Sequence, residues 1–300
     1  MVKEMISEIS SVLYKNRYCT DDAFSLVIDG SDRFDIKVRD IYMGNFTNSA
    51  KKLESISQIS IAATVSIGLD VYTFDDGENA EIKIMSKTNN CTHYLVETEE
   101  DNYCVCPFMK NLYLLGGLEI PTALRTCWMY ETGNKKWVKI SDMDFCRSAA
   151  ACTVFEGKIV VSGGRTRDNY GLPTVESYDH HENKWTNLPK MIIGRYDHGA
   201  VSMGNKMFVI GGRSLLSCEV FDSISRIFSY IKEIENIKSF HLGSSPAVIN
   251  GEKILVYPNV TNYKNRKVHI YDVVKNRWYW EENEIKSLKY VISLTKIPIV

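Results

Sequence analysis

Two pairs of arginines recur at the same interval along this chain of 300 residues. Arg147 and Arg195 lie 48 residues apart, and Arg165 and Arg213 are separated by the same 48 residues. A guanidinium group stays charged and can bind a carboxylate through two parallel hydrogen bonds. A repeated fold would place the members of each pair at equivalent positions. The spacing therefore favours a surface that binds acidic groups.

Histidines supply a second set of candidates, for acid–base chemistry or for metal binding. His198 follows Asp197 at the head of a predicted strand, but neighbouring residues of a strand point to opposite faces. No nucleophile stands at a recognisable elbow beside them. His180 and His181 lie in a predicted hairpin turn, and the repeat places no third or fourth metal ligand nearby. Glycine-rich phosphate motifs are also absent, so we expect no catalytic residue, no metal site and no cofactor.

A repeated unit positions these residues, and three glycine pairs mark it. The pairs recur at intervals of 47 and 48 residues, a period typical of repeat architectures. They are Gly116-Gly117, Gly163-Gly164 and Gly211-Gly212. Each pair closes an apolar strand, and a polar loop then leads to two aromatic residues seven positions apart. The aromatic pairs, including one in a further repeat that lacks the glycine pair, are Tyr130 with Trp137, Tyr178 with Trp185, Phe221 with Phe228 and Tyr271 with Trp278. The polar turn inside each aromatic pair predicts a hairpin.

The apolar strand, the glycine pair and the aromatic pair resemble the kelch repeat. The resemblance covers about residues 56–285 and implies an all-β fold, a kelch β-propeller of four-stranded antiparallel blades. A four-stranded sheet cannot bury both faces alone, so blades stack on one another, with the Trp side chains as apolar plates between them. The repeats run over about residues 56–97, 103–140, 147–188, 195–234 and 243–282.

About five blades are thus recognisable, and a partial one follows. Residues 290–292 and 297–300 are apolar strand material, but the sequence ends before the next glycine pair would occur. An unclosed ring exposes a sheet edge, which proteins normally avoid. We expect either that another segment completes the last blade or that the protein is less stable than its relatives.

Residues 1–50 are predicted to form a short α/β segment whose assignment stays open. A helical stripe spans residues 5–13, and strands are expected at 23–28 and 33–38. This order resembles the opening of a BTB domain. Gly30 and Gly77 are 47 residues apart, which favours a degenerate blade instead. A third hypothesis is a remnant of the helical BACK region, so we divide the chain into this segment and a propeller over residues 51–300.

Composition and charge argue against binding to nucleic acid or membrane and against secretion. The formal net charge is −1, so no overall basic field attracts nucleic acid or an anionic membrane. The first 18 residues carry charges throughout and lack the apolar core of a signal peptide. The eight cysteines show no CxxC or zinc spacing and are expected to be buried, reduced thiols. These features predict a cytoplasmic protein that binds neither nucleic acid nor membrane.

The kelch resemblance also implies a binding face. In kelch adaptor domains, Arg residues ahead of each blade and residues after each glycine pair line one mouth of the propeller and hold acidic peptide segments. The corresponding candidates for partner binding are Arg147, Arg165, Arg167, Asn169, Tyr170, Arg195, His198, Arg213 and Ser214. Glu100 and Gly243 stand at the Arg position of two other repeats, so the basic ring is expected to be partial.

The pattern of degenerate repeats looks like that of the poxvirus kelch-like (BTB-kelch) proteins. In such proteins the BTB domain recruits the cullin-3 ubiquitin ligase and the propeller recruits a substrate. The resemblance implies a non-enzymatic protein-binding module, a truncated viral substrate adaptor that modulates host ubiquitination or innate signalling. Its partner would be a host protein in the host cytoplasm, and direct cullin-3 binding is not expected without a complete BTB domain. The alternatives are a propeller-scaffold enzyme of the galactose-oxidase type and a decayed gene product.

Overall fold

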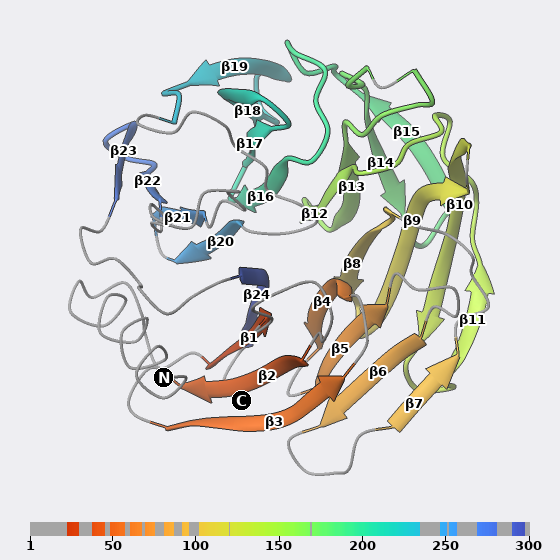
Figure 1. Ribbon diagram of the computed structural model, residues 1–300. Coiled ribbons are helices and arrows are strands. Elements are labelled where there is room, and N and C mark those ends of the chain that lie inside the picture. The colour runs from red at the N-terminus through yellow and green to blue at the C-terminus, as the bar shows by residue number, and fades with distance from the viewer. Residues whose placement is uncertain are drawn as a thin grey trace. The chain divides into compact units, whose positions relative to one another are not determined.

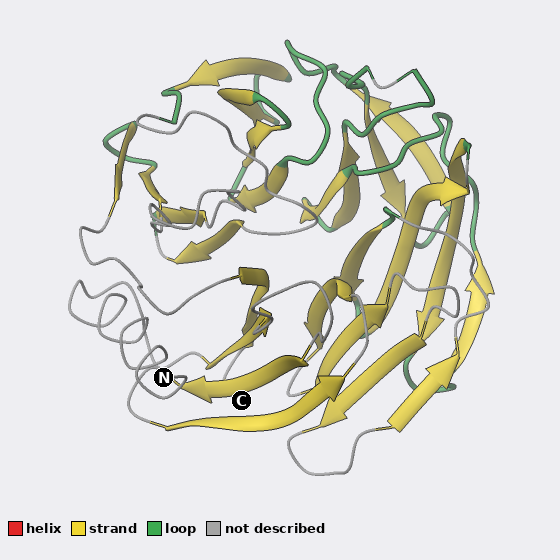
Figure 2. Cartoon of the chain, in the orientation of Figure 1, coloured by secondary structure: helices red, strands yellow, loops and turns green. Residues whose placement is uncertain are grey.

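All regular structure that the computed structural model describes is β-strand (Figure 2). Residues 102–119, 121–168 and 170–234 are described in detail, together with residues 252–256 and 269–280. Elsewhere the description covers the backbone of strands between residues 23 and 95, at 247–250 and at 290–297. These residues confirm the all-β prediction. None of them forms a helix that is long and apolar enough to cross a membrane.

The chain divides into two compact units, each described here by itself. One unit is Glu99–Ser245, and the other combines Met1–Thr98 with Pro246–Val300. Each holds three four-stranded sheets among the described strands (Figure 1), and every strand pairing is antiparallel. The sheets correspond to the predicted blades.

The unit Glu99–Ser245 contains the three blades with a glycine pair. The second repeat forms β8 (Cys104–Phe108), β9 (Asn111–Glu119), β10 (Thr122–Glu131) and β11 (Lys136–Lys139). The third forms β12 (Ala151–Phe155), β13 (Lys158–Ser162), β14 (Val175–Asp179) and β15 (Lys184–Leu188). The fourth forms β16 (Gly199–Met203), β17 (Lys206–Gly212), β18 (Leu215–Asp222) and β19 (Ile227–Ile231).

The other unit joins the two ends of the sequence. The first repeat forms β4 (Ile61–Ile67), β5 (Asp70–Asp75), β6 (Glu81–Ser86) and β7 (Thr92–Leu95). The fifth forms β20 (Ala247–Asn250), β21 (Lys253–Val256), β22 (His269–Asp272) and β23 (Arg277–Trp280). The remaining sheet has the order β24-β1-β2-β3, with β1 (Ala23–Asp29), β2 (Val38–Asn45), β3 (Ser49–Ser57) and β24 (Tyr290–Ile297). The partial repeat at the C-terminal end is therefore completed by N-terminal strands, one of the two expected outcomes.

The aromatic pairs lie directly opposite each other on the two outer strands of four blades. Tyr178 pairs with Trp185 across β14 and β15, and Phe221 pairs with Phe228 across β18 and β19. Their ring centroids are 5.0 Å apart in both blades. Trp185 and Trp278 are buried as predicted, whereas Trp137 is only partly buried. The predicted hairpins are confirmed, because each pair brackets one turn.

Aspartates close the turns of the third and fourth blades. The Oδ1 atom of Asp179 accepts hydrogen bonds from the amides of His181 and Glu182, and Asp222 does the same for Ile224 and Ser225. An Asp side chain that bonds to the amides of the following residues mimics a turn of the backbone. The spacing of seven residues between the aromatic partners follows from this turn.

Two apolar cores lie between neighbouring blades of the unit Glu99–Ser245. The first includes Tyr113 and Leu115 of β9 together with Val161 of β13. The second includes Val160 of β13 and Val209 of β17. The six cysteines with described side chains are free thiols, four buried and two partly buried. This agrees with the prediction of reduced cysteines for that part of the chain.

Candidate protein-binding surface

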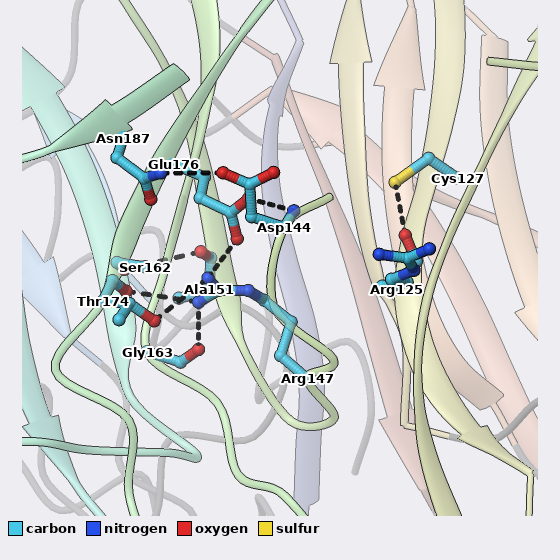
Figure 3. Close-up of polar contacts among 10 residues, drawn as sticks. All are labelled: Arg125, Cys127, Asp144, Arg147, Ala151, Ser162, Gly163, Thr174, Glu176 and Asn187. Atoms are coloured by element: carbon cyan, nitrogen blue, oxygen red, sulfur yellow. Dashed lines mark hydrogen bonds and ion pairs between the residues drawn. The ribbon is translucent and has the colours of Figure 1, made fainter. Parts of the chain in front are cut away.

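Arg147 and Arg195, the first predicted pair, are completely buried rather than exposed. Each side chain has 0 % of its surface accessible. The guanidinium of Arg147 donates to the carbonyl oxygens of Gly163 and Thr174, to the Thr174 hydroxyl and to the Glu176 carboxylate (Figure 3). All these partners belong to the same blade as β12, which follows Arg147.

Arg195 repeats this arrangement one blade later. Its guanidinium donates to the carbonyl oxygens of Gly211 and Ser217 at 2.6 and 2.7 Å and to the Glu219 carboxylate. The Glu219 carboxylate also accepts hydrogen bonds from the amides of Ile192 and Ile193. The charge of each buried arginine is therefore neutralised by a buried glutamate, and most of its donors are satisfied inside the blade.

The backbone of each arginine holds the preceding blade. The amide of Gly117 donates to the carbonyl oxygen of Arg147 at 3.0 Å, and the amide of Gly164 donates to that of Arg195 at 2.9 Å. A Cβ atom on Gly163 would clash with the carbonyl oxygen of Arg195 at the start of the next blade. The glycine pairs are needed because the backbone has a positive φ there and the next element approaches too closely for a side chain.

These contacts correct the predicted role of Arg147 and Arg195. Both were expected at an exposed mouth, yet neither guanidinium can reach a partner outside the protein. The physical reason is the acidic residue two positions before each aromatic, Glu176 and Glu219, which the sequence interpretation overlooked. The sequence did contain a signal, because the arginine and the glutamate occur together. The second repeat has Glu100 in place of the arginine and Trp128 in place of the glutamate, and the fifth repeat has Gly243 and His269 at these two positions.

His198 is also buried, which corrects its predicted place in the binding surface. Its side chain lies between two blades, where Nε2 makes a 2.9 Å hydrogen bond with the hydroxyl of Ser162. Burial, together with the nearby positive charges of Arg195 and Arg147, holds the pKa of His198 well below its usual 6.5. Asp197 instead lies 3.8 Å from Arg213, so the two neighbours do not form an acid–base pair.

Arg165 and Arg213 remain accessible and converge on one aromatic ring. The guanidinium carbon of Arg165 lies 5.2 Å from the ring centroid of Tyr196, and that of Arg213 lies 6.0 Å from it. The side chain of Arg213 is 51 % exposed. We call Arg165, Tyr196 and Arg213 the arginine–tyrosine cluster. Cation–π attraction orients the two guanidinium groups at a modest energetic gain.

The other residues predicted for partner binding lie within a few positions of Arg165 or Arg213 in the sequence. Arg167 and Ser214 are exposed, and Tyr170 is 78 % exposed. Asn169 lies outside the described residues. Tyr196 was missed by the sequence interpretation, although it directly follows Arg195. Tyr196 is partly exposed, and aromatic and arginine side chains are enriched in protein interfaces.

His180 and His181, the candidate metal ligands, have other contacts. Nδ1 of His180 makes a 2.8 Å hydrogen bond with the hydroxyl of Tyr113, a buried residue of β9. The rings of His180 and His181 meet edge to face. Within the described part of the chain, no three His, Cys, Asp or Glu side chains are grouped so as to hold a metal ion.

Comparison with known proteins connects these features to a family. Residues 146–192, the blade that contains Arg147 and Glu176, match the family model described as "Kelch motif". Kelch-like protein 38 of Homo sapiens is 34 % identical over 118 residues, which are 39 % of this chain and 19 % of that protein. Alpha-scruin of Limulus polyphemus is 29 % identical over 126 residues, 39 % of this chain and 14 % of that protein. The chain thus matches less than a fifth of the length of these relatives.

A solved structure supports the fold alone. The structure titled "Structure of YjhT" aligns with a TM-score of 0.57 at 14 % sequence identity and covers 67 % of this chain and 73 % of that one. The antiparallel four-stranded blades agree with the propeller fold that the sequence predicts. The matched motif, the relatives and the blades together support a kelch-repeat protein.

Proposed function

We propose that this chain is a non-enzymatic protein-binding module whose surface includes the arginine–tyrosine cluster. The observation that carries the proposal is the convergence of Arg165 and Arg213 on the ring of Tyr196. Two cations on loops of adjacent blades, Arg213 exposed and Arg165 partly exposed, suit a partner with closely spaced carboxylates. Kelch-like relatives among the matched proteins support the general role.

The proposed partner-binding surface keeps only some of the residues that the sequence predicted for it. Arg165, Arg167, Arg213, Tyr170 and Ser214 stay in it, and Tyr196 joins them. Arg147, Arg195 and His198 leave it, because they support the loops from inside. We propose an acidic peptide segment of a host protein as the partner, and neither nucleic acid nor membrane, since the net charge of the chain is −1.

Charge reversal tests the proposal. A labelled peptide rich in glutamate is titrated with the protein and with the variant Arg165→Glu/Arg213→Glu, and binding is followed by fluorescence anisotropy. We expect the variant to bind at least about tenfold more weakly, because each reversal turns attraction into repulsion. Binding to the unchanged protein should weaken with salt, since exposed charges are screened within about 8 Å at physiological ionic strength.

A matched control separates this site from overall charge. Lys184→Glu/Lys206→Glu makes the same change in net charge at the ends of the same two blades that lie opposite the glycine pairs. This variant should bind like the unchanged protein. Equal losses in both double variants would contradict the proposed site.

The finer proposal is that of a viral substrate adaptor in the host cytoplasm, related to cullin-3 adaptors but without direct cullin-3 binding. Pairing of β1 with β24 supports the assignment of β1, β2 and β3 to a blade rather than to a BTB domain. Size-exclusion chromatography of this protein mixed with purified cullin-3 tests whether the two bind directly. Co-elution at a fixed ratio would contradict it.

A further inference from the structure

The carboxylate of Asp197 lies beside one of the two arginines of the arginine–tyrosine cluster. Its Oδ2 atom is 3.8 Å from Nη1 of Arg213, and its side chain is 25 % exposed, against 51 % for Arg213. We infer that Asp197 is a built-in competitor of acidic partners, which neutralises part of the charge of Arg213 and so lowers the affinity of the cluster for a carboxylate. The inference rests on the proposed function, because it concerns the same surface.

The distance between the two side chains shows that Asp197 does not position Arg213. At 3.8 Å the contact is longer than a hydrogen bond, so the carboxylate attracts the guanidinium without fixing its direction. The buried Arg195 differs, because it donates to the Glu219 carboxylate at 2.5 Å. Other contacts hold Arg213: its amide donates to the carbonyl oxygen of Tyr196 at 2.9 Å, and its guanidinium lies over the Tyr196 ring. Removing the carboxylate should therefore change the charge of the site and leave the arginine in place.

The third blade has the same backbone arrangement without a carboxylate. The amide of Arg165 donates to the carbonyl oxygen of Ser148 at 2.9 Å, the bond that Tyr196 accepts one blade later. The next residue, Ala149, therefore corresponds to Asp197, and their φ values are +50° and +51°. A positive φ is uncommon for residues other than glycine, yet alanine and aspartate both adopt it here. The backbone thus does not require a carboxylate at this position.

The charge balance of the site shows what Asp197 does to a partner. Two guanidinium groups, of Arg165 and Arg213, and the carboxylate of Asp197 leave a formal charge of +1. In the loop after Arg165, the exposed Arg167 and Asp168 are adjacent and carry opposite charges, so they leave this balance unchanged. An approaching carboxylate therefore meets attraction from two cations and repulsion from an anion that is fixed beside one of them.

The substitution Asp197→Asn tests the inference. Asparagine keeps the shape of the side chain, tolerates a positive φ and removes the charge. Binding of the glutamate-rich peptide to the whole chain is measured by fluorescence anisotropy. We expect the variant to bind about threefold to fivefold more tightly, the size of effect that exposed charge pairs give. A peptide with glutamine in place of glutamate should gain nothing, which distinguishes a charge effect from a structural one.

The converse substitution and a matched control complete the test. Ala149→Asp gives the third blade the carboxylate that it lacks and should weaken binding of the glutamate-rich peptide. Its backbone needs no change, because Asp197 has the same φ one blade later. Glu182→Gln removes the same charge as Asp197→Asn, but at the exposed hairpin turn of the third blade, opposite the glycine pair. This control should bind the peptide like the unchanged protein.

The outcomes separate this inference from the proposed function. Unchanged or weaker binding by Asp197→Asn, or an equal gain in Glu182→Gln, would overturn the role of Asp197. The proposed function would still stand if Arg165→Glu/Arg213→Glu loses the peptide, and it would fail if that variant binds normally. Should Asp197→Asn not fold, Ala149→Asp decides, because an unchanged affinity in that variant would also overturn the inference.

Discussion

The guanidinium of Arg195 and the carboxylate of Glu219 form an ion pair that is wholly excluded from solvent. Arg147 and Glu176 form the same pair one blade earlier. Since the backbone carbonyl of each arginine also accepts an amide hydrogen bond from the preceding blade, each arginine joins two blades. Residues that the sequence suggested for partner binding thus hold the fold together.

Breaking the Arg195–Glu219 pair should destabilise the protein strongly. Arg195→Met leaves the Glu219 charge buried without compensation, which costs about 3–5 kcal/mol. The exposed variant Arg213→Ala should change the free energy of unfolding by less than about 0.5 kcal/mol. Urea denaturation checks both values. Arg195→Met/Glu219→Leu should recover part of the loss, and a larger loss in this double variant would contradict the ion-pair explanation.

The buried tryptophan of the third blade should contribute as much to the free energy of unfolding as the Arg195–Glu219 ion pair. Trp185 packs on Tyr178, and its indole nitrogen donates to the carbonyl oxygen of Ser141 at 2.8 Å. Trp185→Ala should cost about 3–5 kcal/mol, the range for removing a large buried aromatic. Thermal unfolding beside the exposed control Arg167→Ala measures this. Equal shifts in melting temperature would contradict the assigned packing role.

Two glycines with positive φ provide a test of the close approach of other residues of the third blade to its glycine pair. Gly164 has φ +93°, and an added Cβ would meet the Cβ of Arg147 and the carbonyl oxygen of Ser148, both at 2.9 Å. Gly157 has φ +73° but no atom within 4 Å of an added Cβ. Gly157→Ala should therefore cost only the conformational strain, roughly 1–2 kcal/mol, whereas Gly164→Ala should cost clearly more. Chemical denaturation distinguishes them, and similar losses would argue against tight contact at Gly164.

Acid should destabilise the protein through His198. Because burial holds the pKa of His198 below its usual 6.5, the unfolded chain binds a proton more readily than the folded one. The stability contributed by neutral His198 is complete above pH 6.5 and is lost as the pH falls below that value. His198→Gln should flatten this dependence in urea denaturation between about pH 5 and pH 7. An unchanged slope, with the exposed variant His181→Gln as control, would assign the acid sensitivity to other groups.

Much of the architecture followed from the sequence. The glycine pairs and the aromatic residues seven positions apart predicted four-stranded blades and their hairpins, because turn geometry and backbone approach restrict which residues fit. These are local constraints, and they repeat at a fixed period. The repeat period did not decide the structure of residues 1–50, because this segment carries few of the glycine and aromatic residues that mark a blade.

Only the tertiary structure decided which cations face the solvent and how the last sheet is completed. Arg147 and Arg165 are both charged loop residues in the sequence, yet one is buried against Glu176 and the other reaches Tyr196. The pairing of β24 with β1 joins segments from opposite ends of the chain. Burial and long-range strand pairing depend on which segments meet in space, and spacing along one chain does not contain that information. The repeat period determined the blades, and their packing determined the surface that remains for a partner.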